Sequence, residues 1–141
     1  MLAALALGLL AVYAVWFSDW FKPKTVEIFH TSRNLHANSK RGNVLENLIF
    51  GVRPKTRFTE LKVVPLAEFE TNKSAVAVWH LISDSNSVPV KSFYYGEHIH
   101  GMRPAIGGVQ AEALDNDVTY RMFITAGNVK GQHDFELKSV D

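Results

Sequence analysis

The chain contains no cysteine among its 141 residues. This absence excludes disulfide bonds, thiolate metal sites and cysteine nucleophiles at the same time. The sequence also lacks a basic run or stripe, and its formal net charge is only +1, so we expect no nucleic-acid partner. A chain of this length is expected to form one compact domain rather than two.

The short signatures of the common enzyme classes are missing as well. No Gly-x-Ser-x-Gly, phosphate-binding glycine loop or His-Glu-x-x-His pattern occurs. Glu60, Glu68 and Glu70 are spread over one segment, which is typical of a solvated face rather than of an acid–base pair. We therefore expect no catalytic activity, no small-molecule substrate and no cofactor of the chain's own.

Charged side chains are absent from the first stretch of the chain, MLAALALGLLAVYAVWF. As a helix it would be about 25 Å long, or about 31 Å if it continued to Phe21, which is close to the thickness of a bilayer core. The pattern predicts a transmembrane anchor helix over residues 1–22. No lysine or arginine precedes the run and no small-x-small site follows it, which favours a retained anchor over a cleaved signal peptide.

Aromatic and basic residues near the end of this run would form an interfacial belt and reach the lipid headgroups. They are Trp16, Phe17, Trp20, Phe21, Lys22 and Lys24. Because basic residues follow the run and none precedes it, the positive-inside bias favours a single-pass protein with a cytoplasmic C-terminal domain. A periplasmic location is nearly as well supported, since the domain type described below is more familiar outside the bacterial cytoplasm.

Residues 23–58 are expected to connect the anchor to a strand-rich region over residues 59–141. Within this connection, residues 25–30 (TVEIFH) are typical of a short strand. Apolar residues then recur at helical spacing before Gly51, which predicts about two turns of amphipathic helix. A helix this short must dock on its own domain, the membrane or a partner. Its apolar residues, which are candidates for partner contact, are Val44, Leu45, Leu48 and Ile49.

Short alternating segments separated by turn residues fill residues 59–141, which predicts an antiparallel sandwich. The expected strands are residues 60–66, 74–82, 90–96, 109–114, 118–126 and 132–140, with a further short strand within the irregular stretch 97–108. About seven strands in this length is the number found in immunoglobulin-like sandwiches.

Residues 114–131 combine a leucine, a tyrosine six positions later, alternating apolar residues, an alanine, an asparagine and a turn glycine. These are Leu114, Tyr120, Met122, Ile124, Ala126, Asn128 and Gly131. The pattern resembles the corresponding region of a fibronectin type III domain. The resemblance implies an all-β sandwich in which Leu114 and Tyr120 form a tyrosine corner, with the ring in the core and the hydroxyl bonded to backbone. The usual proline between leucine and tyrosine is replaced by Asp115, Asn116 and Asp117.

The resemblance covers about residues 60–140. Trp79 corresponds to the core tryptophan on the family's second strand, and Phe93, Tyr95 and Gly96 resemble its aromatic third strand. The expected core residues are Trp79, Phe93, Leu114, Tyr120, Met122 and Ile124. The family is mostly a binding and spacing module, so the resemblance implies no catalytic residue.

The stretch EHIHGMRP holds the sharpest candidate for metal chemistry. In an extended strand, His98, His100 and Met102 would share one face, and imidazole and thioether ligands together suit copper. His80 or His133 could add a ligand. An exposed loop is the simpler interpretation, because the chain has six histidines and a His-x-His pattern is common by chance.

Two other histidines, His30 and His36, follow the anchor, where an imidazole could contact the pigment or haem of a partner. A polar residue near the headgroups is the simpler interpretation for both.

Adjacent tyrosines, Tyr94 and Tyr95, must point to opposite faces of a strand, so that one belongs to the core and the other is exposed unless a partner covers it. With His98 and Arg103 nearby, this edge is a candidate contact surface.

The function favoured by the sequence is a non-catalytic, membrane-anchored accessory subunit that docks on and stabilises a larger membrane protein complex. By analogy the complex would be photosynthetic or respiratory. The alternatives are a membrane-anchored copper-handling protein and a surface-displayed binding module.

Overall fold

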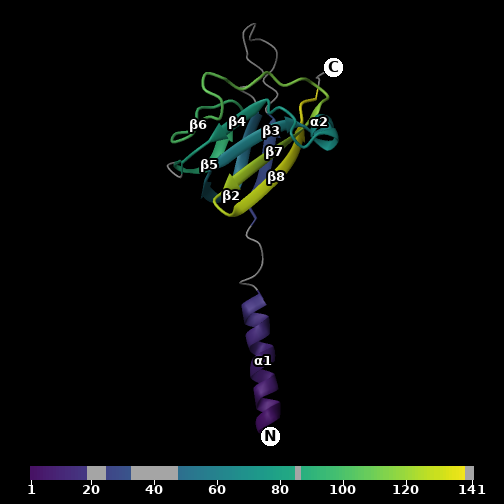
Figure 1. Cartoon of the computed structure of the whole chain (residues 1–141), viewed down its shortest axis with the longest axis vertical. Coiled ribbons are helices and arrows are strands. Elements are labelled where there is room, and N and C mark those ends of the chain that lie inside the picture. The colour runs from purple at the N-terminus through teal and green to yellow at the C-terminus, as the bar shows by residue number, and fades with distance from the viewer. Residues whose placement is uncertain (19–24, 33–47, 85–86, 139–141) are drawn as a thin grey trace.

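The computed structural model describes residues 1–18, 25–32, 48–84 and 87–138 (Figure 1). Two helices are described, α1 Leu2–Ser18 and α2 Leu66–Thr71. The strands are β1 Glu27–Ser32, β2 Leu48–Arg57, β3 Glu60–Pro65, β4 Trp79–Ile82, β5 Pro89–Tyr94, β6 Arg103–Pro104, β7 Thr119–Ala126 and β8 Val129–Glu136. They form one sheet in the order β1-β2-β5 and a second in the order β6-β4-β3-β7-β8, and every pair of neighbours is antiparallel. The predicted sandwich of two antiparallel sheets is therefore confirmed.

The N-terminal helix α1 consists mainly of alanine, leucine and valine and carries no charged side chain. Its apolar side chains are exposed around the helix, and Trp16 is 83% exposed. Tyr13 stacks on Phe17, with ring centroids 4.8 Å apart. Among the described residues, no helix has both the length and the apolar character that crossing a membrane requires. The other residues of the expected interfacial belt, Trp20, Phe21, Lys22 and Lys24, lie outside the described residues.

The strand expected at residues 25–30 is present as β1, but the expected short helix is not found where it can be examined. Leu48 and Ile49 belong to β2, and Val44 and Leu45 lie outside the described residues. Leu48, Phe50 and Val52 are buried at alternate positions, which is the two-residue repeat of a strand. Pairing with β1 on one side and β5 on the other makes this segment a strand rather than a helix. Strands on the N-terminal side of residue 59 are thus part of the sandwich.

Three other segments also differ from expectation. Of the strand expected over 74–82 only β4 forms, and residues 109–114 contain no strand. The unexpected helix α2 begins after Pro65 and places Phe69 against Phe123 of β7, with ring centroids 5.1 Å apart. Proline is well tolerated at a helix start, and the following leucine, alanine and glutamate residues favour helix.

The hydrophobic core lies between the two sheets. Its largest fully buried side chains include Phe50, Phe58, Leu61, Met122 and Ile124. All six residues that the sequence assigned to the core are buried, namely Trp79, Phe93, Leu114, Tyr120, Met122 and Ile124. Phe50 stacks on Phe93, with centroids 5.5 Å apart, and meets Phe135 edge-on at 4.9 Å, so an aromatic contact joins the two sheets.

Tyr120 has the geometry of a tyrosine corner. Its ring is buried against Phe135, and its hydroxyl accepts a hydrogen bond of 3.0 Å from the backbone N–H of Asp115, directly after the buried Leu114. The strand assignments drawn from the resemblance need correction elsewhere. Trp79 lies on the fourth strand rather than the second, and Phe93 lies on the fifth rather than the third, because β1 and β2 precede them.

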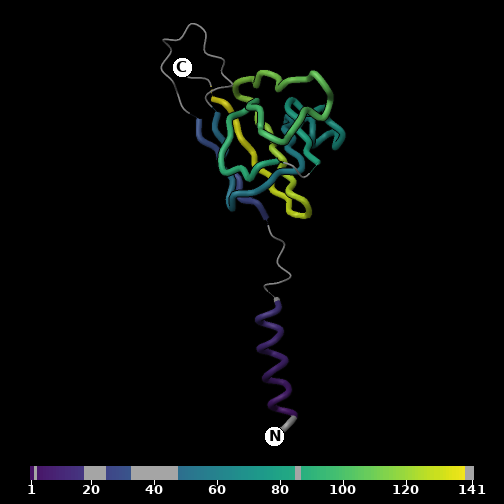
Figure 2. Tube along the Cα trace, turned by 90° about the vertical axis from the view of Figure 1, so that its left-hand side faces the viewer, coloured from purple at the N-terminus to yellow at the C-terminus, as the bar shows by residue number. Residues whose placement is uncertain are grey.

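The two lateral sides of the sandwich differ. On the closed side β1 contacts β8, and Thr25 forms a parallel bridge with Lys130. On the open side, no described strand joins the outer edge of β5 to β4 or β6 of the other sheet. Figure 2 is a view onto the open side, where the segment between β5 and β7 (green) lies. The groove described in the next subsection lies on this open side.

Candidate binding groove on the open side

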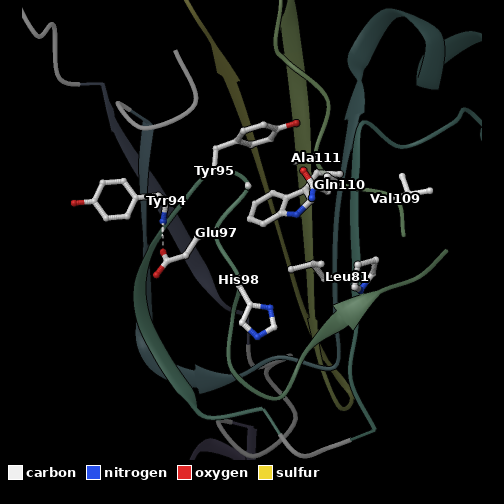
Figure 3. A pocket seen from close by; sticks show the side chains of 11 residues that line it. Leu81, Tyr94, Tyr95, Glu97, His98, Val109, Gln110 and Ala111 are labelled. Carbon is white, nitrogen blue, oxygen red and sulfur yellow. Dashed lines mark hydrogen bonds between the residues drawn. The ribbon is translucent and has the colours of Figure 1, made fainter. Parts of the chain in front are cut away.

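A groove of about 850 Å³ opens between β4 and the segments that follow β5 and β6 (Figure 3). Strand β4 supplies its floor, residues 94–98 form one wall, and residues 109–111 form the other. The lining consists of Trp79, Leu81, Tyr94, Tyr95, Gly96, Glu97, His98, Pro104, Val109, Gln110 and Ala111. The volume lies within the range of pockets that bind ligands or the side chains of a partner.

The floor of the groove is apolar and continuous with the core. Trp79, Leu81 and Tyr95 are buried, and the Trp79 and Tyr95 rings meet edge-on with centroids 5.0 Å apart. The Tyr95 hydroxyl donates a hydrogen bond of 2.8 Å to the carbonyl oxygen of Glu112. Burial raises the pKa of the Tyr95 phenol above its usual value, so the group remains a neutral donor and fixes the wall at Glu112.

The rim of the groove is exposed and mixed in character. Tyr94 is 44% exposed, and Figure 3 shows its ring directed away from Tyr95, as adjacent strand positions require. The Glu97 carboxylate accepts a hydrogen bond of 2.7 Å from the backbone N–H of Tyr94. His98 is exposed on the same wall, and Val109 is 51% exposed on the opposite one. An apolar floor with a rim of polar and aromatic groups is the organisation of a binding surface.

The predicted copper ligands do not share one strand face. Residues 97–102 form an irregular segment with a turn at His100 and Gly101 instead of a strand, and Met102 is 4% exposed within the core, whereas His98 and His100 are exposed. His80 is a further residue considered as a ligand, and its Nε2 lies 2.8 Å from Glu60 Oε1. Within the described ranges, no group of three or more histidine, aspartate or glutamate side chains is placed to hold a metal ion.

The residues predicted to contact a partner are divided between several places. Tyr94 and His98 line the groove, and Arg103 is exposed, 3.7 Å from the carboxylate of Asp84. Ile49 lies half-buried in β2. Leu48 is 1% exposed in the chain's own core, so it is not available to a partner in this fold.

His30 and His133 form a contact across the closed side. His30 Nδ1 lies 2.6 Å from His133 Nε2, so one neutral ring donates to the other. Burial lowers the pKa of both imidazoles, and their mutual repulsion lowers that of His30 further. The proposed role of His30 next to a pigment would require this contact to open. His36 lies outside the described residues.

Several groove residues could not be identified from the sequence, namely Glu97, Val109, Gln110 and Ala111. The available signal was the Gly107–Gly108 pair, which marks a turn, but a turn does not reveal which strand the following segment approaches. Residues 109–111 reach Trp79 only in the folded chain. The next residue, Glu112, donates its backbone N–H to the carbonyl oxygen of Val78, which precedes Trp79, at 2.8 Å.

Comparisons of the chain with protein-family models, with curated proteins and with solved structures gave no significant match.

Proposed function

We propose that the chain is a non-catalytic accessory subunit that is anchored in a membrane and binds a polypeptide segment of a membrane protein partner in the groove on the open side. The observation that carries this proposal is the groove at the edge of the core. Trp79 and Leu81 form its floor and are themselves 4% and 7% exposed, while Val109 on the rim is 51% exposed and Ile106, three residues before it, is 70% exposed. Clustered exposed apolar groups of this kind favour a protein interaction site.

A polypeptide fits the groove better than a small polar substrate. The floor is aromatic and aliphatic, the polar groups lie at the rim, and aromatic residues are enriched at protein interfaces. The groove reaches β5 at its last residue, Tyr94, where an extended segment could add main-chain hydrogen bonds. At Tyr94 that edge is occupied by the Glu97 carboxylate, which an incoming segment would have to displace.

Helix α1 supports the membrane part of the proposal. A helix that is apolar on every side is suited to hydrocarbon, because it lacks the polar face of helices that lie in the plane of the interface. The described helix has 17 residues, which correspond to a length of about 25 Å.

We also infer that the sandwich is of the fibronectin type III kind. In immunoglobulin-like sandwiches strands A, B and E share one sheet, while C, F and G share the other, which can also hold C′. If β1, β2 and β5 correspond to A, B and E, the remaining order C′-C-F-G matches β4-β3-β7-β8. The tyrosine corner at the start of β7 then lies at the start of strand F, where it is expected.

The proposal is tested by site-specific crosslinking in native membranes. A photoreactive amino acid is placed at Val109 on the groove rim and, as a matched control, at Val76, which is 77% exposed and does not line the groove. We expect the chain to remain in carbonate-washed membranes and to crosslink from Val109, but not from Val76, to one membrane protein that also copurifies in stoichiometric amount in mild detergent.

Release of the chain by the carbonate wash would contradict the anchor. Equal crosslinking from both positions would contradict the groove as the docking site. A chain that purifies alone and crosslinks to nothing would support the surface-displayed binding module instead. An absorption spectrum of the copurified complex would identify a pigment or haem in the partner.

A further inference from the structure

One end of the sandwich, which we call the anchor end, must lie close to α1. The chain enters the sandwich at Thr25, and residues 19–24 separate Thr25 from Ser18, the last residue of α1. A fully extended connection over these positions spans at most about 25 Å. Thr25 therefore cannot move farther than this from the end of the helix, whatever path the connection follows.

Strand register gathers basic residues at this end. β1 leads away from Thr25, and β2 runs back antiparallel to it with Arg53 opposite Glu27, so residues 53–57 return to the level of Thr25. Thr25 is itself bridged to Lys130 at the β7–β8 turn. Lys91 lines a shallow depression together with Arg53. The exposed basic residues of the anchor end are Arg53, Lys55, Arg57, Lys91 and Lys130.

Acidic groups near the anchor end do not balance this cluster. Glu27 is the partner of Arg53 in the register. Glu60 is bonded to His80, and Asp84 lies 3.7 Å from another basic side chain, Arg103. In the part of the chain that the structure describes, no ion pair joins a carboxylate to any of the five basic residues. The anchor end is thus positively charged although the net charge of the whole chain is only +1.

We propose that the anchor end binds the headgroups of anionic phospholipids and seats the sandwich on the membrane that α1 enters. The proposal rests on the membrane attachment proposed above. Basic side chains next to a bilayer are attracted to anionic lipid within about one Debye length, roughly 10 Å, and the short connection allows the anchor end to come that close to the bilayer. We favour lipid over an acidic protein as the ligand, because the connection to α1 brings the anchor end close to the bilayer and not to a particular protein.

Seating would also orient the groove. The strands run from the anchor end to the opposite end of the sandwich (Figure 1), so the open side faces sideways when the anchor end lies on the membrane. The groove then faces neighbouring membrane proteins rather than lipid or bulk solvent. Recognition of anionic lipid in this way presents the docking surface to a partner in the same bilayer.

The test uses the full chain with a fluorescent label on Asn128→Cys in the β7–β8 turn, which is specific because the chain has no other cysteine. The chain is reconstituted into vesicles of phosphatidylcholine alone and into vesicles that also contain phosphatidylglycerol, both with a quencher attached to the headgroups. We expect strong quenching only with phosphatidylglycerol, and loss of quenching at high salt. Lys55→Glu with Arg57→Glu should reduce the equilibrium constant for seating at least about tenfold.

The matched control is Lys73→Glu with Lys138→Glu, which makes the same change in net charge at the opposite end of the sandwich. Quenching that is equal in the two kinds of vesicle, with the chain inserted in both, would overturn lipid recognition and leave the anchor intact. An equal loss in the control pair would overturn it too, because net charge alone would then explain the effect. Failure to associate with either vesicle would instead contradict the membrane attachment.

Discussion

The closed and the open sides of the sandwich border the same core but are completed in different ways. On the closed side, backbone meets backbone at Thr25 and Lys130, and His30 bonds His133 between the two sheets. On the open side, the corresponding position is a groove whose floor is Trp79 and Leu81. The chain thus closes one side of its core with its own first strand and leaves a groove on the other.

This difference separates the residues expected to determine stability from those of the proposed binding site. The contacts of the closed side are tight and short, so a change there is expected to affect folding. Several residues of the open rim are exposed, among them Tyr94, His98 and Val109, so changes there are expected to affect the proposed binding more than folding. Trp79 belongs to both groups, since it is buried in the core and also lines the groove.

The largest effect is expected from Trp79→Ala. Removing this side chain takes a large buried aromatic group from the core and should lower the free energy of unfolding by about 3 kcal/mol. Val76→Ala, at an exposed position, should change it by less than about 0.5 kcal/mol. Urea denaturation of the detergent-solubilised chain measures both. A similar small effect of the two substitutions would mean that the open side is not part of the core.

A second substitution tests the closed side. A Cβ atom on Gly131 would lie 2.5 Å from the Val26 carbonyl oxygen, so Gly131→Ala forces β1 away from β8. We expect a loss of about 2 kcal/mol, as for other overpacked sites. Gly107→Ala is the control, because an added Cβ there has no neighbour within 4 Å. If thermal unfolding of the two variants is indistinguishable, the close approach of β1 to β8 is not required.

Tyr120→Phe should have a smaller effect. It removes the hydroxyl that accepts the Asp115 N–H, while the ring stays in the core. The expected loss is about 1 kcal/mol in the free energy of unfolding. Hydrogen exchange at the Asp115 amide should also accelerate. Tyr94→Phe, which alters an exposed ring, serves as the control, and unchanged Asp115 exchange in Tyr120→Phe would argue against a role of the corner in fixing this loop.

The smallest effect concerns pH and the closed side. Because burial lowers the pKa of His30 and His133, the unfolded chain takes up protons first as the pH falls. Their contact therefore stabilises fully above the unfolded pKa of about 6.5, and this stability is lost progressively below it. The bond from Arg121 lowers the pKa of Asp134, so that carboxylate affects stability only in more acidic solution.

The measurement is the urea midpoint of the chain and of its His133→Gln variant between about pH 8 and about pH 5. We expect a decline in the parent chain and a flatter profile in the variant. His98→Gln, on the open rim, should keep the decline of the parent chain. An equal decline in His133→Gln would assign the pH dependence to other groups.

Local patterns predicted strand β7 well, but the strand expected at 109–114 is absent and the last strand is Val129–Glu136 rather than 132–140. The alternation around Tyr120 places β7 and its core residues, because it depends on neighbours in sequence. Gly131, expected in the turn, lies instead within β8 opposite Ile124, and the turn is at Gly127 and Asn128. At Leu48 and Ile49 helical and strand spacing were both satisfied, and pairing with β1 and β5 decided the outcome. The groove could not be predicted from the sequence either, because its walls come together only after both sheets have packed.

The attachment of α1 through β1 also determines how the domain would carry load. The six residues of β1 pair with β2 from Glu27–Arg53 to Ser32–Leu48, and α1 is connected at the Thr25 end of that ladder. Tension between the helix and the sandwich therefore acts along the strand, perpendicular to its hydrogen bonds, and loads them together. A pull perpendicular to the strand would instead break these hydrogen bonds one after another. Strand β1 thus connects α1 to the sandwich in the geometry in which a pull along the strand is shared by all of its hydrogen bonds to β2.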